Sequence, residues 1–205
     1  HQSIGPQLIG ISQDGLTSFE PAFLDELSVI MEWAFDYLQR DGEGDPDERT
    51  WLRDETGGAV YLRLTTRPLE QPVSRRDDPA FHQGVIDGAY WWRAPTPNTE
   101  FVIAYQGCVA TEAIDAAGRI ANDRRDVAVL ALTSADRLGA GWFAAQRARR
   151  RGHNDAASHV DRLMDQVPSH ATILSVTDGH PATLAWLGAV KGHRHIPLGV
   201  EHFGQ

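Results

Sequence analysis

The chain has 205 residues and a formal net charge of −9, and 41% of its residues are hydrophobic and 23% are charged. This composition is typical of a globular protein that can bury a core. A membrane helix needs roughly 20 continuous apolar residues, which the chain lacks. An acidic protein is also repelled by phosphate backbones. We therefore expect no membrane segment and no binding to nucleic acid.

The chain begins with His1 rather than methionine, and residues 1–6 have neither the charged start nor the apolar run of a secretion signal. We therefore expect a piece of a longer protein. The single cysteine, Cys108, cannot form a disulfide within the chain, which suits a reducing compartment. The expected location is the cytoplasm.

The first part of the chain predicts one long helix and one strand. Apolar residues at helical spacing predict an amphipathic helix over residues 21–40. The acidic, glycine-rich run at 41–48 predicts a surface loop, whose role the sequence leaves open. Branched and aromatic residues predict a strand over 59–66.

Prolines and charges in residues 67–80 predict an irregular linker, which divides the chain into domains at 1–75 and 76–205. Strands then alternate with helices. This alternation predicts an α/β domain with a mostly parallel sheet that helices cover on both faces. The expected strands are 101–106, 127–132, 172–176 and 196–200, and the expected helices are 109–121, 135–151, 160–167 and 182–190.

Two turns could bind a ligand, but a structural role explains each. The turn at Gly107 joins a strand to a helix at the edge where open α/β sheets bind ligands, yet it lacks the G-x-G-x-x-G spacing of a pyrophosphate loop. Asp178 and its neighbours precede an expected helix, and Pro181 suits its first turn, so we expect capping. Hydrolase, P-loop and zinc-protease motifs are absent from the sequence.

Histidine could supply metal ligands near the end of the chain, where His193 and His195 would share one side of a strand and His202 follows. The sequence contains no second spaced pair or cysteine to complete the ligand set, so we expect polar surface or interface residues instead of a metal site. The Trp91-Trp92 pair predicts an interface. The arginine cluster predicts a solvated helix face or a partner contact, and it comprises Arg147, Arg149, Arg150 and Arg151.

Several stretches, in order, resemble one enzyme family. His1-Gln2-Ser3 resembles the histidine loop of thiamine-diphosphate enzymes, and Ser18-Phe19-Glu20-Pro21-Ala22-Phe23 resembles the Ser-[Phe/Tyr]-[Asp/Glu]-Pro-Ala-[Phe/Tyr] stretch of the homodimeric bacterial pyruvate dehydrogenase component. Residues 84–90 and 198–205 resemble later segments of the same family. The resemblance implies that 1–75 is the C-terminal part of a pyrimidine-binding domain and that 76–205 is a transketolase C-terminal-like α/β domain.

One position favours a branch of this family. Transketolases resemble the strand that ends near residue 64 but carry Leu-Ser-Arg, whereas this chain has Leu64-Thr65-Thr66. A hydroxyl cannot replace a guanidinium group on a phosphate. The resemblance therefore implies a 2-oxo acid such as pyruvate, with acyl transfer to a lipoyl group. Ketol transfer of the transketolase type, or a non-catalytic dimerisation or regulatory domain, stays the alternative.

The resemblance implies one catalytic residue in this chain, His1, which would face the substrate near the thiazolium ring. Imidazole suits that place because its pKa lies near operating pH. The residues that hold thiamine diphosphate and Mg²⁺ would lie before His1, so we expect the 205 residues alone to bind the cofactor weakly and to be inactive. The implied partners are the remainder of the enzyme, a second subunit in a homodimer, and the acyltransferase core of a dehydrogenase complex.

Overall fold

The structure is a computed structural model, and it describes residues 4–13, 15–42, 54–123 and 125–202. His1 and most of the expected acidic loop lie outside these described residues. The described residues form a two-stranded sheet in the first part of the chain and a five-stranded sheet in the second. The domain boundary after residue 75 stays a prediction.

The first part of the chain pairs two short parallel strands with two helices. β1 and β2 run from the pairing of Leu16 with Ala59 to that of Phe19 with Leu62. The helix expected over 21–40 is confirmed, and the strand expected over 59–66 ends earlier. The first helix and the first strand are not among the predicted elements. The elements are α1 (Pro6–Ser12), β1 (Leu16–Phe19), α2 (Leu24–Tyr37) and β2 (Ala59–Leu62).

The second part alternates strands with helices and 3₁₀ turns. Its strands at 101–106 and 127–132 have the predicted bounds, and the helices near 110 and 135 begin within a residue of the prediction. Its helices and turns are α3 (Pro79–Asp87), η1 (Gly107–Val109), α4 (Ala110–Asn122), α5 (Ala135–Arg150), α6 (His159–Met164), η2 (Pro181–Thr183) and η3 (Leu187–Val190). Its strands are β3 (Ala89–Arg93), β4 (Phe101–Gln106), β5 (Val127–Leu132), β6 (Thr172–Thr177) and β7 (Arg194–Leu198).

The larger sheet has the strand order β3-β5-β4-β6-β7, in which β3 runs antiparallel to β5 and the other pairings are parallel. Every residue of β5 is buried, as its continuous apolar run requires in a strand that is covered on both faces. β7 is an edge strand with alternating burial, and Pro197 lies within it, where a missing N–H is tolerated. The prediction of an α/β fold with a mostly parallel sheet is confirmed.

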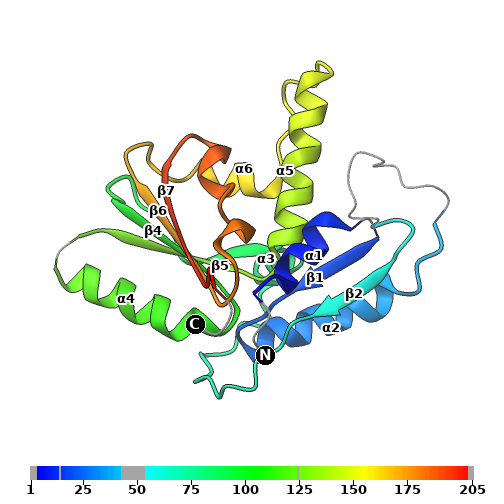
Figure 1. Ribbon diagram of the computed structural model, residues 1–205, viewed down its shortest axis with the longest axis horizontal. Helices are drawn as coiled ribbons and strands as arrows, with labels where there is room; N and C mark the ends of the chain where they lie inside the picture. Colours follow the sequence, from blue (N-terminus) through cyan, green and yellow to red (C-terminus); the bar gives the residue numbers. More distant parts are fainter. Residues whose placement is uncertain (1–3, 14, 43–53, 124, 203–205) are drawn as a thin grey trace.

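Helices cover both faces of the sheet (Figure 1). α4 lies on one face, and α5 and α6 lie on the other, with α5 reaching well beyond the body of the molecule. We call the first part of the chain, α1 to β2, the first unit and the remainder the second unit. The core on the α4 face includes residues of the first unit: Phe19 and Phe23 pack in one cluster with Tyr105 and Val129. Trp92 stacks on Phe23 with ring centroids 5.3 Å apart. The two units of the chain therefore share one apolar core.

The helix expected over 182–190 is wrong. The chain forms two 3₁₀ turns there, η2 and η3, in the connection between the neighbouring strands β6 and β7. A Cβ added to Gly188 would lie 2.5 Å from the Cβ of His195, so this connection presses closely on β7. The last strand also begins two positions before the predicted 196.

α3 and β3 lie almost wholly in residues 81–100, for which the sequence predicts no helix or strand, and only the first two residues of α3 fall in the expected linker. The Asp78 side chain caps α3 by accepting the N–H of Ala80 at 2.9 Å, and Pro79 occupies the first turn. Gly88 ends the helix in the left-handed region at φ 105°. No helix within the described ranges is long and apolar enough to cross a membrane.

Candidate functional site

The carboxyl ends of strands from both units meet at one edge of the molecule. Glu20 follows β1, Arg63 follows β2, and Asp178 follows β6. The Glu20 N–H donates to the carbonyl of Thr133, just after β5, at 2.7 Å, which holds the two sheets together here. The carboxyl edge of a parallel sheet is where α/β proteins bind ligands. The candidate site therefore lies at this edge.

Arg63 is the centre of a polar network at the edge. Its Nη1 donates to Oε1 of Glu20, and its Nη2 donates to the carbonyl oxygen of Asp178 at 2.8 Å and to Oδ2 of the same residue at 3.2 Å. Nε2 of Gln7 donates to the Asp178 carbonyl at 3.2 Å. The Cys108 thiol lies 3.5 Å from Oδ2 of Asp178. We call these five residues the Arg63 network.

Two glycines allow this network to close. Gly107 has φ 69°, and a Cβ there would lie 2.4 Å from Oε1 of Glu20. A Cβ on Gly179 would lie 2.3 Å from the amide of Gln7. A larger residue at either position would displace a member of the network. Gly107 is thus more than a tight turn, because it makes room for the Glu20 carboxylate.

Burial sets the protonation of the Glu20 carboxyl group and the Cys108 thiol at the edge. Glu20 is 3% exposed, and burial raises its pKa to about 7, against the opposing effect of Arg63. Burial, with Asp178 adding to it, raises the pKa of Cys108 to about 11. The thiol is therefore protonated at neutral pH and is a poor nucleophile. Glu20 can exchange a proton near neutral pH, which is the property of a general acid or base.

The edge also holds polar atoms whose hydrogen-bonding capacity is unused. Oε1 of Gln106 and Oγ1 of Thr177 are buried and lack a partner within the part of the chain that the structure describes. They belong to residues paired across β4 and β6. Buried groups of this kind are usually satisfied by ordered water or by a ligand.

The structure describes some, but not all, of the residues that the sequence indicated for this edge. His1 lies outside the described residues, but Ile4, the first described residue of the chain, accepts the N–H of His180 at 2.8 Å beside Asp178. Asp178 is a partner of Arg63, and it is His180 that caps the following turn by accepting the N–H of Ala182 at 3.1 Å. Glu20 and Arg63 were not predicted as site residues. The sequence gives no signal for them, since β1 is not predicted and Arg63 falls inside the expected strand 59–66.

The histidines near the end of the chain do not form one group. His193 is 7% exposed and precedes β7, so the expectation that it shares a strand face with His195 is wrong. Its Nε2 lies 3.2 Å from the carbonyl of Pro168, whereas Nε2 of His195 lies 2.9 Å from Oγ of Ser175. In the described ranges, no three histidine, cysteine, aspartate or glutamate residues lie where they could hold a metal ion.

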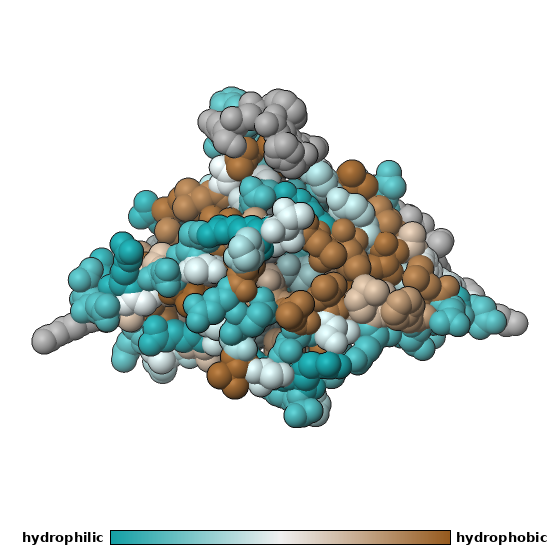
Figure 2. Space-filling model, turned by 90° about the horizontal axis from the view of Figure 1, so that it is seen from below, coloured by the Kyte–Doolittle hydropathy of each residue, from teal (hydrophilic) through white to brown (hydrophobic). Residues whose placement is uncertain are grey.

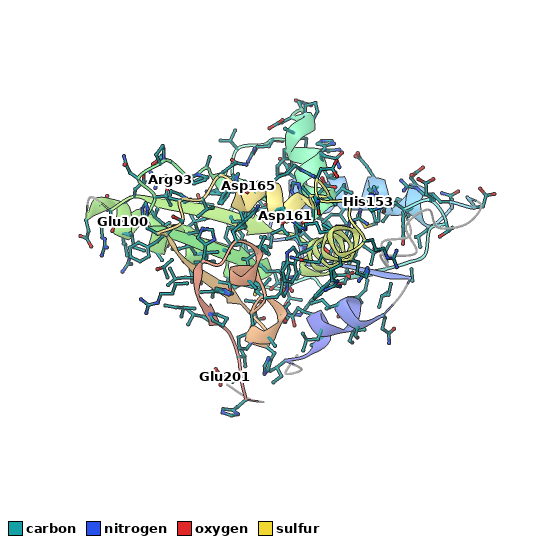
Figure 3. The ribbon with its side chains drawn as sticks, turned by 90° about the horizontal axis from the view of Figure 1, so that it is seen from above. Arg93, Glu100, His153, Asp161, Asp165 and Glu201 are labelled. Carbon is teal, nitrogen blue, oxygen red and sulfur yellow. The ribbon has the colours of Figure 1, made fainter. Side chains whose placement is uncertain are left out.

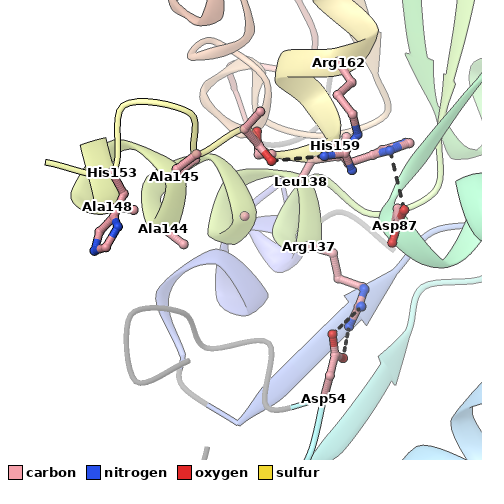
Figure 4. Close-up of a pocket in the computed structure, with 14 residues that line it drawn as sticks. Asp54, Asp87, Arg137, Leu138, Ala144, Ala145, Ala148, His153, His159 and Arg162 are labelled. Carbon is pink, nitrogen blue, oxygen red and sulfur yellow. Dashed lines mark hydrogen bonds and ion pairs between the residues drawn. The ribbon is translucent and has the colours of Figure 1, made fainter. Parts of the chain in front are cut away.

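Away from the candidate site, a cavity of about 490 Å³ lies beside α5 and α6 (Figure 4). Several of its polar groups are already paired: Arg137 binds both oxygens of Asp54, at 3.0 and 3.2 Å. Nε2 of His159 lies 2.8 Å from the carbonyl of Ala89, and its Nδ1 lies 3.5 Å from Asp87. Because these contacts hold α5, α6 and β3 in place, we assign them to the fold.

Other charged residues lie at the ends of the larger sheet. Figure 3 shows Arg93 and Glu100 near each other at one end of the sheet, whereas Glu201 lies apart from them on the segment that follows β7. Glu100 forms an exposed ion pair with Arg125 at 2.5 Å. Exposed pairs of this kind contribute little to stability. The buried charges of the carboxyl edge therefore differ in kind from those at the opposite edge.

This arrangement, an open and mostly parallel α/β sheet with a polar carboxyl edge, defines the class of fold. No protein-family model and no curated protein matches the sequence. Among solved structures, the chain is similar over its full length to part of transketolase. It covers 23% of a Pichia stipitis transketolase solved with sedoheptulose-7-phosphate, at 17% identity and a TM-score of 0.62.

Two further solved transketolase structures are similar to the chain. A Leishmania mexicana transketolase is 18% identical, with a TM-score of 0.61, and the match covers 100% of this chain and 23% of that one. A split-gene transketolase, described as an inactive beta4 tetramer, is 15% identical with a TM-score of 0.59, covering 99% of this chain and 54% of that one. The chain thus has the fold of one part of a transketolase and spans about a quarter of the first two.

Proposed function

We propose that the chain is the C-terminal part of a thiamine-diphosphate enzyme that decarboxylates a 2-oxo acid and passes the acyl group to lipoyl. Its fold supports the relation to such enzymes, and the segment after β2 supports a 2-oxo acid as the substrate. That segment reads Leu64-Thr65-Thr66, where transketolases carry an arginine for a sugar phosphate.

The arginines near the two threonines are already paired. Arg63 is bound to Glu20 and Asp178, and Arg67 forms an ion pair with Glu112. Oγ1 of Thr65 accepts the N–H of Arg67 at 3.0 Å. Among the described residues of this segment, each guanidinium group thus has a carboxylate partner of its own chain. This pairing is the observation that carries our preference for a substrate without a phosphate group.

We assign His1 the catalytic contact with the substrate and Glu20 a supporting role. Ile4, three positions after His1 in the sequence, is held at the edge beside Asp178. Glu20, with a pKa of about 7, could supply or store a proton there. We further propose a homodimer, with the acyltransferase core of a complex as a second partner.

The described residues do not fit the cofactor. They offer no acidic cluster for Mg²⁺. The split-gene transketolase whose chain is 54% covered is described as inactive, which supports the view that the 205 residues alone are inactive. Calorimetric titration of the chain with thiamine diphosphate and Mg²⁺ should show no binding at micromolar concentrations. Micromolar affinity would contradict the proposal that residues outside this chain hold the cofactor.

The proposed activity is tested with the complete protein, including the polypeptide before His1. Pyruvate should be decarboxylated only when thiamine diphosphate and Mg²⁺ are present, and His1→Ala should lower kcat by about 100-fold, as loss of a general acid–base group typically does. Unchanged turnover in this variant would remove His1 from the mechanism. Ketol transfer is the second candidate, because the similar solved structures are transketolases.

A further inference from the structure

We propose that Gln7 is a positioning residue for the proposed catalytic histidine, and that it acts together with the turn after β6, which comprises Asp178, Gly179 and His180. We call these three residues the 178–180 turn. Together they hold the segment that follows His1. The proposal rests on the catalytic role proposed for His1, and it gives the second unit of the chain a part in the reaction.

The 178–180 turn holds the start of the chain at two points. The His180 N–H donates to the carbonyl of Ile4 at 2.8 Å, and Nε2 of Gln7 donates to the carbonyl of Asp178 at 3.2 Å. Gln7 is only 4% exposed. Because Gln7 and Asp178 are 171 positions apart, this junction exists only in the folded chain.

The turn itself is fixed by two other segments. Nη2 of Arg63 donates to the carbonyl of Asp178 at 2.8 Å and to its Oδ2 at 3.2 Å. The N–H of Val200, after β7, donates to the carbonyl of Gly179 at 2.8 Å. A Cβ added to Gly199 would lie 2.4 Å from that same carbonyl, so the segment after β7 packs closely on the turn. The turn is therefore a firm support for the start of the chain.

The helix that carries Gln7 is also firmly placed. A Cβ added to Gly10 would lie 2.1 Å from Oγ of Ser18, so α1 packs closely on β1. Ile11, one residue later, packs against the core on the face that α5 covers. Gln7 therefore reaches the 178–180 turn from a rigid element, as a positioning residue should.

The tie at Ile4 limits where the proposed histidine can lie. Ile4 is three positions after His1 in the sequence. Three residues of extended chain span at most about 11 Å, so a fixed Ile4 restricts the space that is open to His1. A misplacement of about 1 Å can cost about 100-fold in rate. A small movement of the turn should therefore lower turnover even though the turn contains no proposed catalytic residue.

Polar contacts, rather than apolar packing, form the junction. Figure 2 shows exposed apolar surface gathered on the side where α2 lies in Figure 1. The Gln7 side chain reaches the turn through one hydrogen bond, and its Oε1 lacks a partner within the described ranges. A single substitution should therefore loosen the junction while it leaves the core in place.

Gly179 offers a second way to loosen the same junction. The three atoms nearest to a Cβ added there all belong to the Gln7 amide, the closest at 2.3 Å. Gly179 is not among the glycines with positive φ, so an alanine adds no strain of its own to the backbone. Gly179→Ala therefore acts by displacing Gln7.

Steady-state turnover of pyruvate by the complete protein, including the polypeptide before His1, tests the proposal. Gln7→Met removes the donor and keeps the length of the side chain. It should lower kcat by about 10-fold and leave KM within about 2-fold, because a misplaced acid–base group weakens the transition state and not substrate binding. Gly179→Ala should have the same effect. Circular dichroism checks that both variants fold.

Gln166→Met is the matched control. It removes a hydrogen bond of the same kind and length, from Nε2 of Gln166 to the carbonyl of Arg162 at 3.2 Å, at an exposed place on α6. This variant should keep the wild-type kcat.

A double variant separates positioning from a general loss of structure. If Gln7 acts through the histidine, then Gln7→Met should cause no further loss of kcat in a His1→Ala background. A merely structural role would lower kcat by the same factor in both backgrounds.

Hydrogen–deuterium exchange tests the junction without turnover. The His180 amide is protected because it donates to Ile4. Its exchange should become at least about 10-fold faster in Gln7→Met, because loosening a junction raises the population of its open form. Gln166→Met should leave this exchange unchanged.

Unchanged exchange at His180 in Gln7→Met would overturn the proposal, and so would an equal loss of kcat with and without His1→Ala. If His1→Ala alone leaves turnover unchanged, the catalytic role of His1 fails, and Gln7 then loses its role as a positioning residue even where the exchange data confirm the junction. The failure of this proposal and the failure of the proposed function are thus distinguishable.

Discussion

Burial decides the chemistry of single residues at the carboxyl edge. Glu20 and Asp136 are both acidic and both nearly inaccessible to solvent, and burial raises their pKa values to about 7 and about 6. Arg63 beside Glu20 and the Ser18 N–H beside Asp136, at 2.8 Å, only partly offset the loss of water. These residues could not be identified from sequence, because Arg63 and Glu20 are 43 positions apart and become partners only in the fold.

The raised pKa of Glu20 predicts a dependence of stability on pH. Because the folded-state pKa of about 7 lies above the ordinary value of 4.5 for a glutamate, the folded state holds the proton more tightly than the unfolded state. The stabilisation is complete below the unfolded-state pKa and is lost as pH rises toward the folded-state value. Between about pH 5 and about pH 8, the wild type should lose about 1–3 kcal/mol relative to Glu20→Gln.

Urea unfolding of both proteins across this range checks the prediction. Asp136 contributes with the same sign in the lower part of the range, but it is present in both proteins, so their difference reports Glu20. Parallel pH profiles would show that Glu20 titrates normally.

Gly107 is the residue whose size the Arg63 network constrains most directly. Gly107→Ala should destabilise the chain by about 1–3 kcal/mol, because the new methyl group meets Glu20 and the backbone is left-handed at φ 69°. Gly118→Ala in α4 is the matched control: no atom lies within 4 Å of its added Cβ, so it should stabilise the helix by about 0.5–1 kcal/mol. Equal effects in thermal unfolding would argue against close packing at Gly107.

At the scale of elements, sequence predicts best where periodicity is strong and the run is long. α2, α4 and α5 and the buried strands β4 and β5 all have this property, and all were predicted. α1 and β1, of 7 and 4 residues, are too short for a reliable pattern. α3 mixes polar and apolar residues, and the connection between β6 and β7 takes its shape from the strands that it joins. Tertiary packing decides these elements.

The start of α5 joins the two units, so a substitution that breaks its contacts should lower the stability of the chain. Oγ of Ser134 accepts the N–H of Arg137 at 3.0 Å and donates to the carbonyl of Ser18 at 2.6 Å. Ser134→Ala removes both bonds from a fully buried place and should cost about 1–3 kcal/mol. Thermal unfolding measures this cost. Ser12→Ala, at an exposed serine, should change stability by less than about 0.5 kcal/mol, and an equal loss in the two variants would contradict the account.

At the scale of the whole molecule, the fold and the proposed function rest on different observations. The fold is confirmed by the strand order and by the likeness to transketolases over the full length of the chain. That likeness, at 17% and 18% identity, carries the fold alone. The choice of a 2-oxo acid depends on Thr65, Thr66 and the paired arginines around them, which is a small part of the molecule. It is therefore the claim that most needs a direct test.

The most direct test is the ratio of kcat/KM for pyruvate to that for xylulose 5-phosphate, measured on one preparation of the complete protein with thiamine diphosphate and Mg²⁺. If Thr65 and Thr66 stand where a phosphate-binding arginine would be, the ratio should exceed about 100, because a lost charged contact costs several kcal/mol. Thr66→Arg should lower this ratio. A ratio below 1 in the wild type would contradict the account and would establish ketol transfer.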